Sequence, residues 1–419
     1  MTFTPRQWWT CSLDVEQLAW ASVAAARDAA NRVAAARRLP LNLETDPALI
    51  AGSFAAMEHM NVDGRTPSPW APLSSFFPTE DGWVRLHANY PHHATTLQNA
   101  LNVSTPDELT RALSTRSAAD IEETVSRAGG IAAAVRSASQ WRAHPHGAAT
   151  AEEPWAAVER RGQRPALAAA EGALLAGVRV LDLTRVIAGP TCSQLLACLG
   201  ADVLRIDPPA RPELLNQHLS NGMGKRSAAI DLAADPDALT HLLATADVVL
   251  LGYRPGSLAR FGLDPAELID RHPRLVVASL SAWGEQGSWT TRAGFDSIVQ
   301  AACGIADECA ADDGRPGALP VQALDHSTGY LMAAHVMDLL ADAHAGIVRI
   351  SLLGAARTLL AYPRRSSAPA APTAGLPLMR VQVNSPHGRI SLPAPPLTVD
   401  GKLLHEPVGG YAHAAAAWV

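Results

Sequence analysis

Apolar and polar positions alternate in blocks along the middle of the chain, and this rhythm predicts most of its secondary structure. Five short runs of branched apolar residues are separated by amphipathic stretches of roughly eight to twelve residues, the spacing typical of strands joined by helices. The strand-like runs are VRVLDL, ADVLRID, SAAIDL, DVVLLG and RLVVASLSAWG, at residues 178–183, 201–207, 227–232, 247–252 and 274–284. Such a pattern indicates an α/β fold, with a parallel sheet covered by helices on both faces. Ligands in sheets of this kind bind at the carboxyl ends of the strands.

The first part of the chain has a different pattern. An alanine-rich stretch predicts a helix over residues 13–38, with Ser12 as its N-cap. Asp81-Gly82 separates two short apolar runs within residues 76–91, which is a hairpin signal. The segments PDELTRALS, SAADIEETVSRAG and SASQWRAHP, within residues 106–160, indicate short helices. We therefore expect a small α+β unit in this part of the chain.

The end of the chain is marked by a change in composition. A segment rich in Pro, Ala and Ser at residues 363–377 indicates a linker. Two short strands are predicted on either side of Ser385-Pro386-His387-Gly388. The expected organisation is a small α+β domain over 1–165, a Rossmann-like domain over 172–362, and a linker with closing strands over 363–419 that pack on the larger domain.

Composition and charge narrow the possible functions. The chain has 419 residues, of which 48% are apolar and 18% charged, and its net charge is −6. This excludes a disordered chain and argues against a nucleic-acid partner. No signal peptide or membrane span is apparent, and the five cysteines form no C-x-x-C pair. We expect a cytoplasmic protein with reduced thiols, in which an anionic ligand would need a local cluster of cations.

The residues alone leave the chemistry open. The sequence contains no G-x-G-x-x-G, Walker A, G-x-S-x-G or H-E-x-x-H motif. GMGKR at 222–226 is compatible with a phosphate cradle that uses Lys225 and Arg226, or with a solvated loop. The histidine pairs at 92–93 and 144/146 lack a partner ligand at helical spacing, so no metal is expected. Asp325 precedes a long apolar helix, where it is either an N-cap or an ionised nucleophile.

The segment VLDLTRVIAGPTCSQLLACLGADVLRIDPP at 180–209 resembles the opening of the family III CoA-transferases, which include formyl-CoA transferase, carnitine CoA-transferase and the related α-methylacyl-CoA racemases. The resemblance continues in the family's order with GKRSAAIDL, YRPGSLARFGL, HPRLVVASLSAWGEQGSW, RAGFDSIVQAACG and LPVQALDHSTGYLMAA, the last at 319–334.

The resemblance implies a mechanism and a set of site residues. The family's catalytic aspartate matches Asp325, which would attack an acyl-CoA thioester to give a mixed anhydride and then an aspartyl-CoA thioester. The partners would be an acyl-CoA and a carboxylic acid, with CoA as a substrate, no permanently bound cofactor and a homodimeric assembly. The residues expected to contact CoA are Ile187, Arg205, Lys225, Arg226, Arg254 and Ser279.

Three departures from the family pattern accompany this resemblance. The segment that resembles the family's small domain precedes the Rossmann-like part, so the chain looks permuted, or like a fusion that has lost its first sheet. No clear glycine-rich loop is found, and Ile187 occupies the position of a glutamine in formyl-CoA transferase. Together with Trp283, Ile187 suggests a bulkier, more apolar acid. A non-catalytic CoA-binding paralogue or subunit is the main alternative; a racemase is less favoured, because Phe295 stands where the racemases of the family have a histidine.

Overall fold

The computed structural model describes residues 8–68, 70–169, 172–364 and 378–419. Its largest element is a seven-stranded sheet with the order β6-β12-β11-β10-β7-β8-β9. The strands are β6 (Ala156–Gln163), β7 (Arg179–Leu183), β8 (Asp202–Asp207), β9 (Lys225–Ala229), β10 (Val248–Leu251), β11 (Val276–Ser281) and β12 (His344–Ser351). All neighbours are parallel except β6, which pairs antiparallel with β12. From β7 the parallel strands follow the 3-2-1-4-5-6 order of the Rossmann fold.

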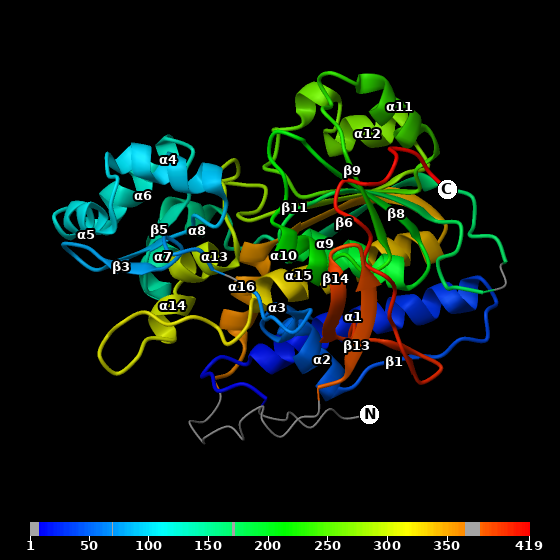
Figure 1. The fold of residues 1–419 in the computed structure, drawn as a ribbon, viewed down its shortest axis with the longest axis horizontal. Helices are drawn as coiled ribbons and strands as arrows, with labels where there is room; N and C mark the ends of the chain where they lie inside the picture. The colour runs from blue at the N-terminus through cyan, green and yellow to red at the C-terminus, as the bar shows by residue number, and fades with distance from the viewer. Residues whose placement is uncertain (1–7, 69, 170–171, 365–377) are drawn as a thin grey trace.

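Successive residues of each parallel strand enter two different cores. Val248 and Leu250 of β10 pack with α9 (Ala188–Cys198) and α15 (Ala323–Ala341), whereas Val249 and Leu251 pack with α11 (Pro236–Thr245) and α12 (Pro265–Arg271). Figure 1 shows α11 and α12 above the sheet and α9 and α15 below it. A strand buried on both faces must be apolar at consecutive positions, which explains the VVLL run. The expected α/β sheet with flanking helices is confirmed.

Helix α1 (Val15–Ala36) packs against α15 and extends this core. Ala19, Ala26 and Ala30 are fully buried on α1, and their small side chains allow the two helices to approach closely. The N-cap is Asp14, whose carboxylate accepts a hydrogen bond from the Gln17 N–H at 3.1 Å, and not Ser12 as predicted. Asp14 lies two residues closer to the first buried turn of α1 than Ser12 does. Its side chain can therefore accept from a backbone N–H of that turn that would otherwise lack a partner.

A smaller unit has its own core and lies at the left of Figure 1. The hairpin predicted around Asp81-Gly82 is confirmed, with Phe76 opposite Arg85. The three segments predicted as helices are α5, α6 and α7. The unit consists of β3 (Phe76–Pro78), β4 (Trp83–Leu86) and β5 (Ala132–Ala134), packed with α4 (Pro91–Leu101), α5 (Pro106–Ser114) and α6 (Ala118–Arg127).

The first 165 residues therefore contribute to more than one part of the molecule, since α1 and β6 belong to the large core and sheet. Sequence reasoning predicted neither β6 nor β12. AAVERRGQ has no apolar alternation, and β6 is an exposed strand at the edge of the sheet. Such a strand is stabilised by backbone pairing with β12, which leaves no hydrophobic signal in the sequence. The domain boundary expected at residue 165 stays a prediction.

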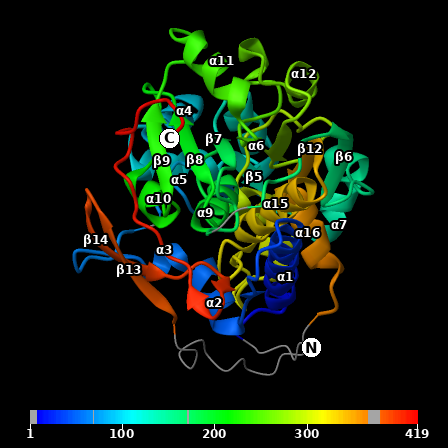
Figure 2. The same cartoon turned by 90° about the vertical axis from the view of Figure 1, so that its right-hand side faces the viewer.

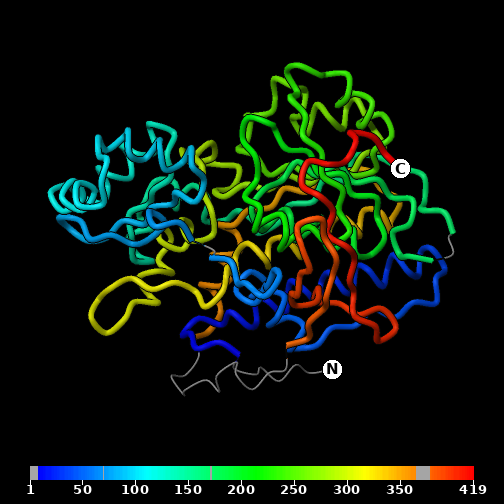
Figure 3. The backbone as a smooth tube through the Cα atoms, in the orientation of Figure 1, coloured from blue at the N-terminus to red at the C-terminus, as the bar shows by residue number. Residues whose placement is uncertain are grey.

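The two strands predicted near the end of the chain are present as β13 (Arg380–Ser385) and β14 (Gly388–Pro393). They pair with β2 (Asn61–Val62) in a sheet separate from the large one, and Val383 and Ile390 lie in the same core as α9 and α15. The segment that follows crosses the β9 edge, where the Ala414 N–H donates to the Ser227 carbonyl at 2.8 Å (Figures 2 and 3). Most of the predicted linker, 365–377, lies outside the described residues.

The remaining elements are short. They are β1 (Leu43–Glu44), α2 (Pro47–Phe54), α3 (Ala56–His59), α7 (Ala138–Ala143), α8 (Pro145–Ala149), α10 (Leu215–Ser220), the 3₁₀ turn at Ala259–Phe261, α13 (Asp296–Cys303), α14 (Ile305–Glu308), α16 (Leu352–Ala361), β15 (Thr398–Val399) and β16 (Lys402–Leu403). Within the described ranges, no helix combines the length and the apolar character needed to span a bilayer.

Candidate active site

The carboxyl ends of β7, β10 and β11 bring three predicted site residues to one edge of the sheet. Ile187 caps α9 after the β7 loop, Arg254 is exposed three residues beyond β10, and Ser279 lies in β11 opposite Leu251. β7 and β10 are the neighbours between which the strand order reverses. Sheets of this kind bind ligands at that reversal, so Ile187, Arg254 and Ser279 stand where a substrate can be expected.

The loop between β7 and α9 is held in an unusual conformation. Val186 has a φ of +69°, which is strained for a β-branched residue. Its N–H donates to the Glu213 carboxylate at 3.0 Å, and Asn221 donates to its carbonyl at 3.4 Å. These contacts fix the backbone immediately before Ile187. Backbone strain maintained by its surroundings is a frequent feature of ligand sites.

Arg205 is not available to a phosphate, which corrects the prediction that it contacts CoA. Its side chain is 1% exposed and forms ion pairs with Asp207 at 2.8 Å and Glu213 at 2.7 Å. Burial opposes ionisation of Glu213, but the charges of Arg205 and Arg185 outweigh it and lower the Glu213 pKa to about 2. Tyr90, from the smaller unit, donates a hydrogen bond to the same carboxylate. Arg205 therefore links elements inside the protein.

Lys225 is also turned inward. Its ammonium group is buried and donates to Ser193 Oγ at 2.8 Å and to the Pro190 carbonyl at 3.2 Å, with the Asp182 carboxylate at 3.4 Å. Burial lowers the pKa of Lys225 to about 8, against the opposing effect of Asp182. An amine with three internal partners connects β7, α9 and β9 and cannot reach a solvent-exposed phosphate.

Arg226 lies at the opposite edge of the sheet from Arg254. It is the second residue of β9, pairs with Asp202 at 2.7 Å, and lines an open cleft of about 440 Å³ at the amino ends of the strands. The GMGKR segment is neither a phosphate cradle nor a solvated loop. Met223 is fully buried, and a Cβ on Gly222 would lie 2.3 Å from the His218 carbonyl oxygen. Its glycines permit close packing against the protein itself.

Asp325 occupies the third position of α15, whose N-cap is Gln322, so the N-cap interpretation is wrong. Only 4% of the residue is exposed, and its backbone N–H donates to Asp296 Oδ2 at 3.0 Å. Burial, reinforced by the negative charge of Asp296, raises the pKa of Asp325 well above its usual range. The expectation that the helix end keeps this carboxyl ionised therefore fails, because desolvation outweighs the helix dipole.

Asp296 is the second carboxyl group of the site and was not singled out from the sequence. It is the first residue of α13 and is 1% exposed. Burial raises its pKa to about 6, although it accepts hydrogen bonds from the N–H groups of Asp325 and Leu324 and from the Gln300 amide. In the sequence, only the position of Asp296 within the family-like segment RAGFDSIVQAACG could have indicated that it belongs to the site. The structure thus joins two buried carboxyl groups at the ends of α13 and α15.

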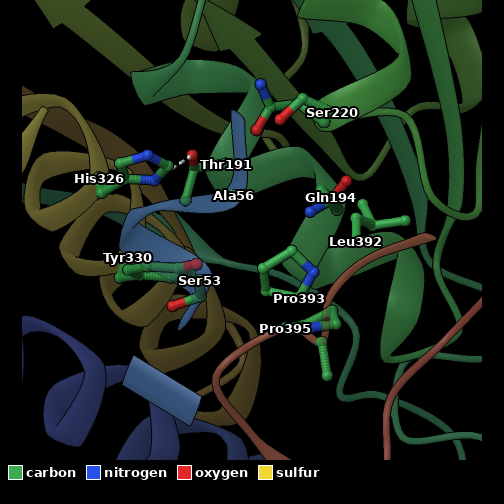
Figure 4. Close-up of a pocket in the computed structure, with 12 residues that line it drawn as sticks. Ser53, Ala56, Thr191, Gln194, Ser220, His326, Tyr330, Leu392, Pro393 and Pro395 are labelled. Carbon is green, nitrogen blue, oxygen red and sulfur yellow. Dashed lines mark hydrogen bonds between the residues drawn. The ribbon is translucent and has the colours of Figure 1, made fainter. Parts of the chain in front are cut away.

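His326 faces a small cavity on the other side of α15 (Figure 4). Its Nδ1 lies 3.3 Å from the Thr191 hydroxyl, and burial lowers its pKa to about 3, so the ring is neutral. The cavity has a volume of about 10 Å³, room for roughly one water molecule. Helices α2, α3, α9, α10 and α15, the end of β14 and the segment after it form its walls, and it is far too small for an acyl-CoA.

Trp283 does not shape an acid-binding surface, contrary to the sequence prediction. It is 2% exposed and packs with Trp141, Trp289 and His146, and His146 Nε2 contacts the Trp283 carbonyl at 3.0 Å. This aromatic cluster attaches the segment after β5 to the large core. His144 stacks on Trp141 in the same cluster. In the described parts of the chain, no group of three or more His, Cys, Asp or Glu side chains is arranged to hold a metal ion.

Comparison with known proteins finds similarity over the central part of the chain. Residues 175–372 match the family described as CoA-transferase family III. A probable fatty acyl-CoA transferase of Mycobacterium tuberculosis, Rv3272, is 35% identical over 178 residues, which make up 39% of this chain and 45% of that protein. A succinate–glutarate CoA-transferase of Agrobacterium fabrum is 33% identical over 175 residues, 37% of this chain and 44% of the relative.

A crystal structure of Rv3272 has 34% identity to this chain and a TM-score of 0.42, covering 45% of this chain and 57% of the other. The chain spans less than half the length of the two relatives named above. The matched segment contains the sheet from β7 to β12, together with Asp296 and Asp325. Residues 175–372, just under half of the chain, are therefore the part that is similar to CoA-transferase family III.

Proposed function

We propose that this chain is an acyl-CoA:carboxylate CoA-transferase in which Asp325 is the covalent nucleophile. The observation that carries the proposal is the buried Asp325–Asp296 pair, within the family-matched region. The names of the relatives, which include a succinate–glutarate CoA-transferase, support a reaction between a CoA thioester and a free acid. The acyl-CoA and the acceptor acid are the two substrates, CoA is not a permanently bound cofactor, and a homodimer is the proposed assembly.

The reaction proceeds by attack of an Asp325 carboxylate oxygen on the thioester carbonyl. The C–S bond breaks, and the products are an aspartyl mixed anhydride and the CoA thiolate. The thiolate then attacks the aspartyl carbonyl, forms an aspartyl-CoA thioester and releases the first acid as its carboxylate. The acceptor acid repeats these two steps in reverse, so that Asp325 is regenerated and CoA leaves on the new acid. Covalent catalysis divides one difficult transfer into easier steps.

The proton of the carboxyl pair controls when Asp325 can attack. Two neighbouring buried carboxylates repel each other, so the pair retains a proton over a range of pH. Attack requires that the proton is absent from Asp325. Asp296 can hold it, and its pKa of about 6 places the exchange close to neutral pH. We therefore expect kcat/KM to decrease as the pH falls, with an acid limb well above the usual aspartate pKa.

The Asp296→Asn variant tests this coupling. Asparagine can still accept the Asp325 N–H but carries no charge, so the pKa of Asp325 should fall. The acid limb of kcat/KM is expected to move to lower pH, and this is read from a pH–rate profile in buffers of constant ionic strength. Asp313→Asn, at an exposed position, is the matched control and should leave the limb in place. An unchanged or upward-shifted limb in Asp296→Asn would contradict the coupling.

CoA is proposed to bind at the sheet edge that holds Ile187, Arg254 and Ser279. Arg254 supplies an exposed cation there. A charge-assisted contact with a phosphate contributes about 1.5–3 kcal/mol, so Arg254→Ala should weaken CoA binding by roughly ten- to a hundredfold. Titration calorimetry with CoA measures the loss. Arg274→Ala, at an exposed position before β11, removes the same charge from the other edge and should not change the affinity. Equal losses in the two variants would exclude Arg254 from the site.

One contact favours a racemase as the second candidate. The ring of His87 stacks on Phe295 with centroids 4.2 Å apart, so an imidazole lies beside the position at which the racemases of the family have a histidine. Two-base racemisation needs proton-transfer groups on both faces of Cα. Incubation of a 2-methylacyl-CoA in D₂O separates the two reactions, because a racemase incorporates deuterium at Cα and a CoA-transferase does not.

A further inference from the structure

A second group of polar side chains lies where the smaller unit meets the beginning of α13. Arg85 is in β4, and His87 follows two positions later in extended chain, so both side chains leave the same face of the strand. His87 stacks on Phe295, the residue before Asp296. We call this group the Arg85 cluster; its members are Trp70, Phe76, Arg85, His87, His93 and Phe295.

Arg85 is a buried cation without a counter-ion. The residue is 7% exposed, and its guanidinium carbon lies 5.0 Å from the centre of the Trp70 ring and 4.9 Å from that of Phe76. Its Nε has no hydrogen-bond partner, and no carboxylate of the described chain lies within ion-pair distance of the group. Burial lowers the pKa of Arg85 to about 10, against the opposing effect of Asp296, so the guanidinium is charged at neutral pH.

Other buried arginines of the described chain each have an ion pair or several hydrogen bonds, although some N–H groups of Arg164 and Arg205 also lack a hydrogen-bond partner; Arg85 has no ion pair or hydrogen bond of this kind. Arg205 has Asp207 and Glu213, Arg164 has Asp247, and Arg37 donates to three backbone carbonyls. A buried charge that lacks a partner destabilises the folded state, because its desolvation is not compensated. The Trp70 and Phe76 rings near the guanidinium offset part of that cost, but Nε remains without a hydrogen-bond partner.

Like Nε of Arg85, ring nitrogens of the histidines in the Arg85 cluster lack hydrogen-bond partners. His87 is 4% exposed, and neither of its ring nitrogens has a hydrogen-bond partner; Nδ1 of His93, 6.2 Å away between ring centres, also lacks one. Burial, together with the nearby His93 and Arg85, lowers the pKa of His87 to about 3, so its ring is neutral and offers one N–H donor. Unpaired donors grouped around one buried cation point to an anionic ligand.

We propose that Arg85 and His87 bind a carboxylate of the acid substrate, between the aromatic rings of the Arg85 cluster and beside the Asp296–Asp325 pair. The guanidinium matches a carboxylate geometrically, and His87 adds a neutral donor. Asp296 connects the two groups of residues, since it accepts the Asp325 N–H and experiences the charge of Arg85. This inference rests on the proposed function for the identity of the ligand, which is either the reacting carboxylate or a second carboxylate of a dicarboxylic acid.

The binding test uses the Asp325→Asn variant, so that it is independent of turnover. Hexanedioate and hexanoate are titrated into this variant, and into the double variant that also carries Arg85→Met. Methionine keeps an apolar stem between the rings but removes the charge. We expect Arg85→Met to weaken binding by roughly ten- to a hundredfold, the fold-change of one lost charge-assisted contact. An effect on both acids identifies the reacting carboxylate, and an effect confined to hexanedioate identifies a second one.

Kinetics and stability separate binding from a structural role. With Asp325 intact, Arg85→Met should raise KM for the acid and leave KM for the acyl-CoA unchanged, and Arg85→Lys should recover part of the loss. Arg85→Met should also unfold at a temperature no lower than the parent, because it removes an unpaired buried charge. Arg111→Ala, at an exposed position of α5, is the control for both the kinetic and the stability measurements.

Two results would overturn the inference. One is unchanged acid binding in Arg85→Met; the other is a loss of acid affinity accompanied by an equal loss of CoA affinity and a lower unfolding temperature. If Arg85→Met does not fold, ¹⁵N-histidine spectra of the otherwise unaltered protein replace it: hexanedioate must shift the ring signals assigned through His87→Gln. If acid binding depends on Arg85 but the protein transfers no CoA, the proposed function is wrong and the Arg85 site still stands.

Discussion

The Asp325→Asn variant is expected to lose CoA transfer by on the order of a thousandfold or more, the scale of removing a covalent nucleophile. Asparagine retains the size and hydrogen bonding of aspartate, but an amide oxygen is a much weaker nucleophile. Affinity for CoA should stay within a few fold, because the contacts proposed for CoA lie at the sheet edge near Arg254. Initial rates over a panel of acyl-CoA donors and acid acceptors measure the loss.

Trapping provides the chemical evidence for the same assignment. Wild-type protein treated with an acyl-CoA and then with hydroxylamine should yield a hydroxamate on the peptide that contains Asp325, detected by mass spectrometry. If Asp325→Asn retains more than about a tenth of the wild-type rate, the substitution raises the barrier by less than about 1.4 kcal/mol. Asp325 is then not the nucleophile. If both proteins bind CoA and neither transfers it, a non-catalytic CoA-binding paralogue becomes the better interpretation.

The same substitution should stabilise the protein at neutral and alkaline pH. The pKa of Asp325 is raised in the folded state, so its contribution to stability is fully present below the unfolded pKa of about 3.9 and is lost as the pH rises through the folded value. Asparagine has no proton to lose. The gain in unfolding temperature should therefore be small near pH 4 and larger at pH 8. A variant less stable than wild type at pH 8 would contradict the direction of this pKa shift.

Arg205→Ala is expected to lower the free energy of unfolding by about 3–5 kcal/mol, the usual cost of breaking a buried ion pair from one side. The substitution leaves Asp207 and Glu213 buried without their cation, and Glu213 also holds the Val186 N–H and the Tyr90 hydroxyl. Chemical denaturation followed by circular dichroism measures the change.

A matched set of variants shows whether the loss is electrostatic. Combining Arg205→Met with Asp207→Asn and Glu213→Gln removes the charges together and should recover much of the stability. Arg274→Ala, at an exposed position, should change it by less than about 0.5 kcal/mol. If Arg205→Ala were as stable as wild type and lost only CoA affinity, the sequence-based phosphate role would be right and the structural one wrong.

The sequence was sufficient to predict the five strands from β7 to β11, although not β6 and β12, because strands buried on both faces must be apolar at consecutive positions. VLDL, VVLL and RLVVAS each became a parallel strand at nearly the predicted residues. The segment from 319 to 334 directed attention to Asp325 through family resemblance. Short-range signals were equally sufficient for the Asp81-Gly82 hairpin and for the helices that begin at Pro106, Ala118 and Ala138.

The roles of the cations depended on the tertiary structure, because a sequence shows where a charge lies but not what it faces. Arg205 and Lys225 were expected at a phosphate, yet each meets carboxylates from neighbouring strands or loops, and only Arg254 of the predicted set is an exposed cation at the carboxyl edge. Partners such as Asp182 for Lys225 are 43 residues away in the chain. Pairing across a parallel sheet is non-local and leaves no spacing pattern to read.

The same reason explains the groups that sequence reasoning missed. Asp296 and Asp325 are 29 residues apart, and Arg85 comes from a hairpin far earlier in the chain, yet α13 brings all three to one region. Burial then reverses the expected chemistry: the helix end that would favour an ionised Asp325 is desolvated, and the pKa rises instead. Local sequence determined the secondary structure of this protein, whereas long-range packing decided which charges are buried, which are paired and which remain available to a substrate.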